Sequence, residues 1–189
     1  MTTDEVVYQG SFFEVLNRQQ PDGRVFESVR RAPGVRVIIS DNESQKVLLT
    51  REFRNELNAW NYRLPGGKVF DTLADYQKFL KSGEDVRIVA DKKAVEESSE
   101  EAGIRVDSLD YIETSTLGST VEWDLYVYVS SNWIKAEGQS LEEGEQIETD
   151  NWFTFAEAEK MILNGEVREE RIALILLKWL HRQKEKNDN

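Results

Sequence analysis

The chain has 189 residues, enough for one domain, or one domain with an extra sheet, and for a sizeable core. It carries 36 acidic against 24 basic residues, and a net charge of −12 disfavours non-specific binding to nucleic acids or anionic membranes. Cysteine is absent, which excludes disulfides, thiolate metal sites and cysteine nucleophiles and fits a reducing compartment.

Neither secretion nor membrane insertion is indicated. Residues 1–5 (MTTDE) lack the basic start and the apolar run of a signal peptide. No apolar run is long enough to cross a bilayer. We therefore expect a cytoplasmic protein with no membrane or nucleic-acid partner.

The first fifty residues favour strands. Residues 6–9 and 12–18 are rich in strand-forming residues, and residues 24–30 should pair back across the turn at 20–23 (QPDG). A second hairpin is expected between residues 35–39 and 47–49.

Helical spacing begins at Leu73 and recurs at Tyr76, Phe79 and Leu80, which predicts a short helix ending near Gly83. The remaining expected elements are a helix over 91–102, strands over 109–116, 121–129 and 147–153, helices over 156–163 and 168–182, and a flexible tail over 184–189. Mixed strands with a few helices indicate the α+β class.

The most informative stretch is residues 94–104 (AVEESSEEAGI). In a helix closed by Gly103, Glu97, Glu100 and Glu101 would share one face. Like charges at that spacing repel, so the pattern makes sense if a divalent cation lies between the carboxylates. A solvated acidic face is the simpler interpretation of this stretch alone. The tight turn at residues 64–67 (LPGG) upstream favours a metal site.

Turn and helix together resemble the Nudix hydrolase signature, G-x5-E-x7-R-E-U-x-E-E-x-G-U, in which U is apolar. Five residues fill their positions in its second half: Glu97, Glu100, Glu101, Gly103 and Ile104. On these residues the chain resembles the Nudix hydrolases.

The chain departs from this signature in three ways. Glu96 stands where the family has arginine, and Ser98 stands where it has an aliphatic residue. About fifteen residues are inserted around positions 69–90. The early glutamate of the pattern has no clear counterpart, with Asp71 and Glu84 as candidates.

The resemblance extends over nearly the whole chain to the ADP-ribose pyrophosphatase branch, through FESVRR, REFR and EQIE. It implies a Nudix α/β/α sandwich with a mixed sheet over residues 35–183. An N-terminal antiparallel sheet, residues 1–34, would help to build a homodimer with the substrate near its interface. Residues 115–119 (STLGS) lack the proline usual in this branch, so the substrate is less closely defined than the family.

The resemblance implies Mg²⁺-dependent hydrolysis, with Mn²⁺ as a substitute, of ADP-ribose or a related nucleoside diphosphate sugar. Metal ions would neutralise phosphate charge and lower the pKa of bound water. By resemblance, Glu97 and Glu101 are the main metal ligands, and Glu100 shares a metal or orients a water. The Gly66 carbonyl would supply a further oxygen.

The resemblance implies that the general base is a glutamate in the loop before the last strand, where Glu145 fits best and Glu142 and Glu143 are alternatives. Arg51 and Arg54 are candidates for phosphate contacts, because a guanidinium group forks onto phosphate oxygens. Each of these residues also has a simpler interpretation. The glutamates could belong to a solvated hydrophilic loop, and the two arginines could lie at a solvated strand end.

Three aromatic residues, Trp60, Trp123 and Tyr8, could stack on a nucleobase. Aromatic side chains in a strand-rich chain more often belong to the core. Core packing is therefore the favoured interpretation of each.

The charge reversal at Glu96 leaves two outcomes open. A nearby lysine takes over the role of the arginine, from the same helix (Lys92 or Lys93) or from the inserted segment (Lys78 or Lys81). Alternatively, the site is weakened and the protein binds a nucleotide without hydrolysing it. Retention of all three glutamates favours activity. A third possibility, outside the family, is an acidic protein that binds Ca²⁺ or a protein partner through its glutamate face. The sequence lacks the spaced Asp/Asn pattern of a Ca²⁺ loop, which disfavours this role.

Overall fold

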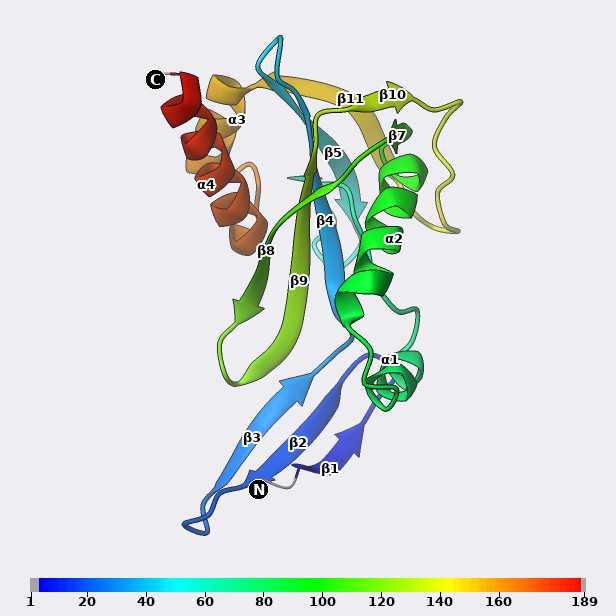
Figure 1. The fold of residues 1–189 in the computed structure, drawn as a ribbon, viewed down its shortest axis with the longest axis vertical. Helices are drawn as coiled ribbons and strands as arrows, with labels where there is room; N and C mark the ends of the chain where they lie inside the picture. The colour runs from blue at the N-terminus through cyan, green and yellow to red at the C-terminus, as the bar shows by residue number, and fades with distance from the viewer. Residues whose placement is uncertain (1–3, 188–189) are drawn as a thin grey trace.

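The computed structural model describes residues 4–187, and its main element is a mixed sheet of nine strands (Figure 1). The strands of this sheet are β1 (Asp4–Gln9), β2 (Glu14–Gln19), β3 (Val25–Arg30), β4 (Gly34–Asp41), β5 (Lys46–Arg54), β6 (Ala59–Arg63), β8 (Asp110–Leu117), β9 (Val121–Ser130) and β11 (Ile147–Thr154). A separate antiparallel pair joins β7 (Ile104–Val106) to β10 (Trp133–Lys135). The helices are α1 (Leu73–Leu80), α2 (Val86–Glu100), α3 (Phe155–Leu163) and α4 (Glu170–Asn187).

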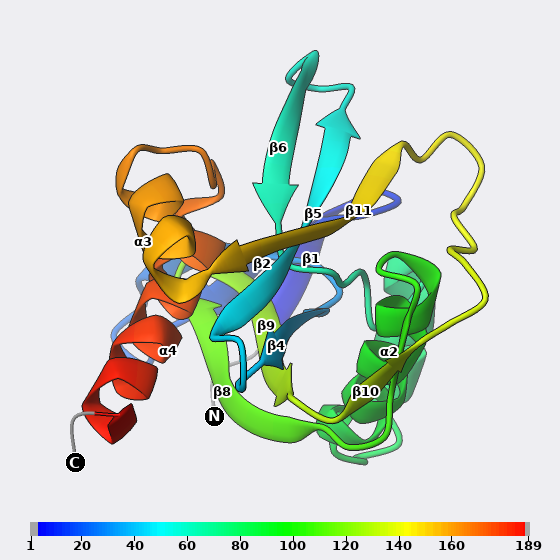
Figure 2. The ribbon, with the colours of Figure 1, turned by 90° about the horizontal axis from the view of Figure 1, so that it is seen from above.

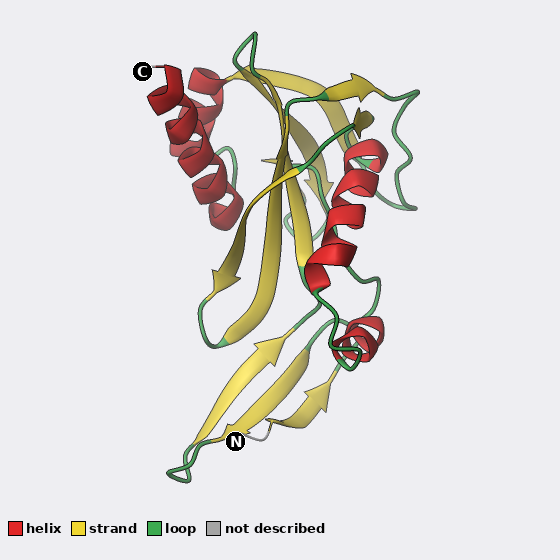
Figure 3. Ribbon diagram, viewed as in Figure 1, coloured by secondary structure: helices red, strands yellow, loops and turns green. Residues whose placement is uncertain are grey.

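Helices cover both faces of this sheet, as Figures 2 and 3 show: α2 on one face, α3 and α4 on the other. The central strand β4 contributes side chains to the apolar clusters on both faces of the sheet. Its residues Val35, Val37 and Ile39 join the apolar cluster under α2, whereas Ile38 joins the cluster under α3 and α4. Alternate side chains of a strand point to opposite faces, which explains this division. The expected α/β/α sandwich of the α+β class is confirmed.

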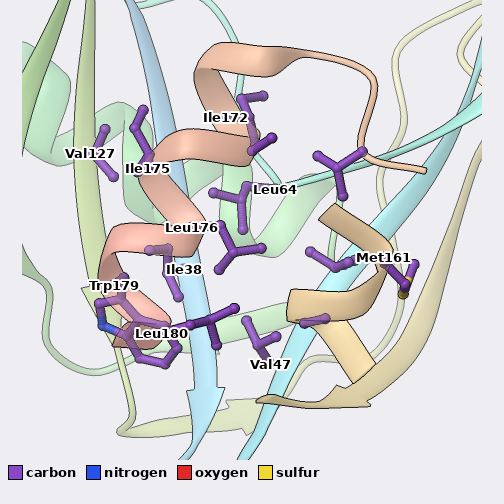
Figure 4. Close-up of a cluster of buried hydrophobic side chains, with 14 of the residues drawn as sticks. Ile38, Val47, Leu64, Val127, Met161, Ile172, Ile175, Leu176, Trp179 and Leu180 are labelled. Atoms are coloured by element: carbon purple, nitrogen blue, oxygen red, sulfur yellow. The ribbon is translucent and has the colours of Figure 1, made fainter. Parts of the chain in front are cut away.

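The larger apolar cluster is built on the buried face of α4 (Figure 4). Ile172, Leu176, Trp179 and Leu180 recur at helical spacing and are each at most 5% exposed. Trp179 meets Phe155 of α3 edge-on, with ring centroids 5.2 Å apart. Burial of each such side chain stabilises the fold by about 1.5–3 kcal/mol.

A split between β4 and β5 positions the glycine turn. The two strands pair only near Ser40 and Asp41. Beyond that point the N–H groups of Val35 and Val37 donate instead to the carbonyls of Gly67 and Pro65, at 2.9 Å each. The turn at 64–67 is therefore wedged into the sheet beside the central strand.

The N-terminal strands β1, β2 and β3 form the expected antiparallel sheet, with the predicted turn at 20–23 between β2 and β3. This sheet is continuous with the main one, because Val29 and Arg30 of β3 pair in parallel with Val121 and Glu122 of β9. Figure 1 shows it extending from one end of the sandwich. The division between residues 1–34 and 35–183 thus falls inside one hydrogen-bonded layer.

The segment around 69–90 contains α1 and the first turn of α2. Helix α2 starts at Val86, capped by the Asp85 side chain, which accepts from the Arg87 N–H at 2.9 Å. The sequence predicted this start at Asp91. The structure extends the helix by one turn that contains β-branched residues, which are weak helix formers on their own. At the other end of the chain, residues 184–187, expected in a flexible tail, continue α4, and residues 188–189 lie outside the described part. No helix between residues 4 and 187 is long and apolar enough to span a bilayer.

Candidate active site

The glycine turn lies directly against the carboxylate face of α2. The Gly66 N–H donates to Glu101 Oε2 at 2.7 Å. A Cβ atom at position 67 would lie 2.2 Å from Glu97 Oε1, so only glycine leaves room for this carboxylate. Gly66 has a φ of 140° and faces the Val35 carbonyl at a distance that excludes a side chain.

Lys93 neutralises part of the carboxylate face. Its Nζ lies 3.3 Å from Glu97 Oε1, 3.6 Å from Glu100 Oε2 and 3.7 Å from Glu96 Oε2. Its three neighbours raise the pKa of Lys93 despite the opposing effect of burial. The repulsion expected between the glutamates is thus offset by an internal cation.

Burial dominates the titration of two glutamates. It raises the pKa of Glu101 to about 8, and the hydrogen bond from Gly66 only partly opposes this. It also raises the pKa of Glu97, against the lowering effect of Lys93. Both carboxylates are therefore poorly solvated, and a bound cation would favour their charged forms.

The donor set fits a hard divalent cation. Glu97, Glu100 and Glu101 supply carboxylate oxygens, the ligands that Mg²⁺ prefers. Within residues 4–187, no three acidic, histidine or cysteine side chains are gathered closely enough to hold a metal ion as they stand. The Lys93 ammonium, however, already rests on two of these carboxylates, which marks the place as favourable for positive charge.

The loop between β10 and β11 closes this site on the other side. A small cavity of about 50 Å³ is lined by Gly67, Lys68, Glu97, Glu100, Glu101, Ser140, Glu142 and Glu145. The structure therefore brings Glu145, the predicted base, beside the three glutamates of α2. Glu142 also lines the cavity, and its N–H donates to Glu145 Oε2 at 2.9 Å. Glu143 does not line it.

A larger cavity of about 520 Å³ adjoins the carboxylates. Its lining includes Gly67, Lys68, Glu101 and Glu145, which also line the small cavity. Away from them it is lined by aromatic, arginine and glutamate side chains, with a few small or apolar residues: Phe12, Phe13, Trp123, Arg31, Arg36, Arg54, Arg63, Glu52, Glu56, Pro33, Gly34, Gly66 and Leu125. A volume in this range suits a nucleotide-sized ligand.

The two predicted arginines have different places. Arg54 lines the large cavity, where Glu52 and Glu56 hold its guanidinium at 2.8 and 3.1 Å. Arg51 lines neither cavity: it pairs with Glu148 at 2.9 Å and stacks on the Trp60 ring. Trp60 is engaged by Arg51, whereas Trp123 faces the large cavity.

Sequence reasoning did not single out Arg31, Arg36 and Arg63, which line the same cavity. One pattern could have indicated Arg36: it is a lone charge within the apolar strand Val35–Ile39. Its Nη1 donates to the Val35 carbonyl and to the Gly66 carbonyl, the group expected to bind metal. Arg31 and Arg63 stand among other charged residues and have no such distinguishing context.

Comparison with known proteins shows to which family the chain belongs. The NUDIX domain model matches residues 30–174, most of the chain. The chain belongs to the Nudix family. A crystal structure of an ADP compounds hydrolase has a similar fold, with a TM-score of 0.68 at 18% identity over 100% of this chain and 96% of that chain. No curated protein matched the sequence.

In this Nudix chain the cation near the carboxylates comes from Lys93, one helical turn before Glu96. Lys92, Lys78 and Lys81, the other lysines considered, form no ion pair within residues 4–187. Lys93 also lines a third cavity, of about 300 Å³, together with Asp71 and Asp75 of the inserted segment. The insertion therefore lies against the helix at the point where the Nudix signature is altered.

Proposed function

We propose that the protein is a Mg²⁺-dependent pyrophosphatase, with Mn²⁺ as a substitute, that hydrolyses ADP-ribose or a related nucleoside diphosphate sugar. The products would be a nucleoside monophosphate and a sugar phosphate. One observation carries the proposal: the carboxylate cavity adjoins a nucleotide-sized cavity, and the two share lining residues such as Gly67 and Glu101. A Nudix domain and a similar fold in an ADP compounds hydrolase support it.

The carboxylates divide the work in this proposal. Glu97, Glu100 and Glu101, with the Gly66 carbonyl, would hold Mg²⁺, which neutralises phosphoryl charge and lowers the pKa of a bound water. Glu145 lies across the small cavity and would accept the proton of the attacking water. Water oxygen would then bond to one phosphorus as the bridging P–O bond breaks, and the second phosphate would leave.

The large cavity would hold the rest of the substrate. Aromatic side chains such as Phe13 and Trp123 line this cavity and would stack on a nucleobase, and Arg54, which also lines it, would contact a phosphate or the ribose. Arg51 lines neither cavity and pairs with Glu148, so we assign it no contact with the substrate.

Chromatography of AMP released from ADP-ribose, with Mg²⁺ and with EDTA, tests this function. A panel of nucleotide sugars and dinucleotides should run beside it. Metal-dependent AMP release would support the proposal, whereas turnover of another panel member alone would move the substrate. Thermal stabilisation by these ligands without any turnover would favour a nucleotide-binding protein that does not hydrolyse its ligand.

A further inference from the structure

We propose that Gln77, in the inserted segment, is a positioning residue for the nucleoside part of the substrate. Its side-chain amide fastens both ends of the turn between β1 and β2, and this turn carries Phe12 and Phe13 of the large cavity. The inference deepens the proposed function and rests on it, because that function places a nucleoside in this cavity. It also gives a role to residues that the Nudix signature lacks.

Glu14 is a buried carboxylate at the start of β2. It is 1% exposed, and a buried charge is costly unless hydrogen bonds or ion pairs compensate it. Arg30 of β3 donates from Nη1 to its Oε1 at 3.2 Å. The Gln77 side chain of α1 donates from Nε2 to its Oε2 at 2.5 Å. One oxygen of this carboxylate is therefore bound within the N-terminal sheet, and the other is bound by the inserted helix.

The Gln77 amide also reaches the preceding strand. Its Oε1 accepts a hydrogen bond from Gln9 Nε2 at 3.3 Å. Gln9 is the last residue of β1 and pairs directly with Glu14, the first residue of β2. One side chain of the insertion thus bonds to both residues of the pair that closes the turn at residues 10–13.

The inserted helix is itself anchored. The Thr72 side chain caps the N-terminus of α1. Leu73 is 2% exposed, and the Phe70 ring packs against the ring of Phe79, with centroids 5.1 Å apart. Figure 1 shows α1 beside the N-terminal sheet and next to the start of α2. Gln77 therefore projects from a packed support, as a positioning residue requires.

The fastened turn carries exposed aromatic side chains. Phe12 and Phe13 are 56% and 43% exposed and line the large cavity. Within the turn the Gly10 N–H donates to the Phe13 carbonyl at 2.8 Å. Aromatic faces stack on planar rings, and exposed apolar side chains commonly mark a binding surface. A nucleobase would bind more tightly if these side chains are already ordered, because ordering them on binding costs affinity.

Isothermal titration calorimetry of the full chain in EDTA tests this role, with AMP and ribose 5-phosphate as probes. Gln77→Ala should weaken AMP binding about fivefold, because the turn must then be ordered on binding. Binding of ribose 5-phosphate, which has no base, should be unchanged. Lys78→Ala, at the exposed neighbouring residue of α1, should bind both probes like the wild type.

A mutant cycle connects Gln77 to the aromatic side chains. In the double variant Phe12→Ala, Phe13→Ala, the further change Gln77→Ala should alter AMP binding by less than about twofold, because the groups that Gln77 positions are gone. A fivefold loss in that background would overturn the proposal. So would equal losses of AMP and ribose 5-phosphate binding in Gln77→Ala, wild-type AMP binding in that variant, or no AMP binding by the wild type.

Exchange of the two polar groups provides a test that restores the contact. Gln77→Glu should weaken AMP binding more than Gln77→Ala does, since two carboxylates would then face each other. Glu14→Gln combined with Gln77→Glu restores an amide–carboxylate pair and should recover AMP binding, and failure to recover it would overturn the proposal. If the substrate panel shows no turnover while AMP binding follows this order, the proposed function fails and the positioning role stands. Hydrolysis of ADP-ribose with wild-type AMP binding in Gln77→Ala would have the reverse meaning.

Discussion

Lys93 lies among the carboxylates that are expected to hold a divalent cation. Its Nζ lies 3.3 Å from Glu97 and 3.6 Å from Glu100, so it and a metal ion would compete for the same oxygens. We expect Lys93→Met to bind Mg²⁺ about tenfold more tightly, since repulsion between the two cations is removed. Calorimetric titration with Mg²⁺ would measure the change, with Lys92→Met as the control on the same helix. Weaker binding would show instead that Lys93 holds the carboxylates in place.

Glu101 makes the stability of the metal-free protein depend on pH. Its pKa in the folded state is about 8, raised by burial from an ordinary 4.5. Between these values the folded protein keeps a proton that the unfolded chain has lost, so stability falls as pH rises through about 8. Thermal unfolding in EDTA should therefore show a melting temperature that declines from about pH 5 to about pH 9. Glu101→Gln should flatten this decline, leaving the smaller part from Glu97; an unchanged slope would contradict the assignment.

The sequence predicted the glutamates of the site but not its buried arginines, because the glutamates follow a local pattern and the arginines do not. Helical register, which is local, predicts that Glu97, Glu100 and Glu101 share one face, and the resemblance to the Nudix signature predicts their role as metal ligands. The buried environment of Arg36 depends on Gly66, thirty residues away, and that of Arg63 depends on Glu169. Such partners are set by the fold, so the pattern of the strand could not reveal them.

The glycine turn is the element on which the geometry of the site depends. Gly67→Ala would place a Cβ atom 2.2 Å from Glu97 Oε1, the mobile end of a side chain. We expect it to displace that carboxylate, lowering activity at least about tenfold while costing about 1 kcal/mol of stability.

Gly66→Ala is the matched comparison within the same turn. Its Cβ atom would meet the Val35 carbonyl oxygen at 2.3 Å, from a φ of 140° that other residues rarely adopt. Backbone cannot yield as a side chain does, so we expect a loss of several kcal/mol. Urea unfolding of both variants would measure the difference; equal losses would contradict the distinction between the two positions.

The predicted helices and strands were reliable where a regular hydrophobic pattern extends over a long segment. The hairpins around residues 20–23 and 41–44 and the helices after β11 occupy the predicted stretches within a few residues. The short strands β6, β7 and β10 were not predicted. Strands of three to five residues are defined by pairing with distant neighbours, as β10 is with β7, rather than by their own pattern.

At the scale of the whole molecule, the N-terminal sheet leaves apolar side chains uncovered. Val6 and Phe26 are 48% and 50% exposed and share one face by register, and β1 is an edge strand. Exposed apolar residues on a sheet edge mark an association surface. We propose a homodimer formed there, with about twice the chain mass of 21.9 kDa.

Light scattering after size exclusion would test this assembly. The double variant Val6→Lys, Phe26→Lys should be monomeric, because it places charge in the interface. Leu163→Lys, at an exposed apolar residue of α3, should remain dimeric. A monomeric wild type would contradict the proposal.

The central claim, metal-dependent hydrolysis at the carboxylates of α2, is tested most directly by the kcat of Glu97→Gln. The comparison is with the wild type and with Glu96→Gln, on ADP-ribose and saturating Mg²⁺. Glu97 is buried against the glycine turn, whereas the neighbouring Glu96 is exposed. The account predicts that Glu97→Gln lowers kcat at least about a hundredfold with the fold intact, while Glu96→Gln remains within a few-fold of the wild type. Full activity in Glu97→Gln would contradict it.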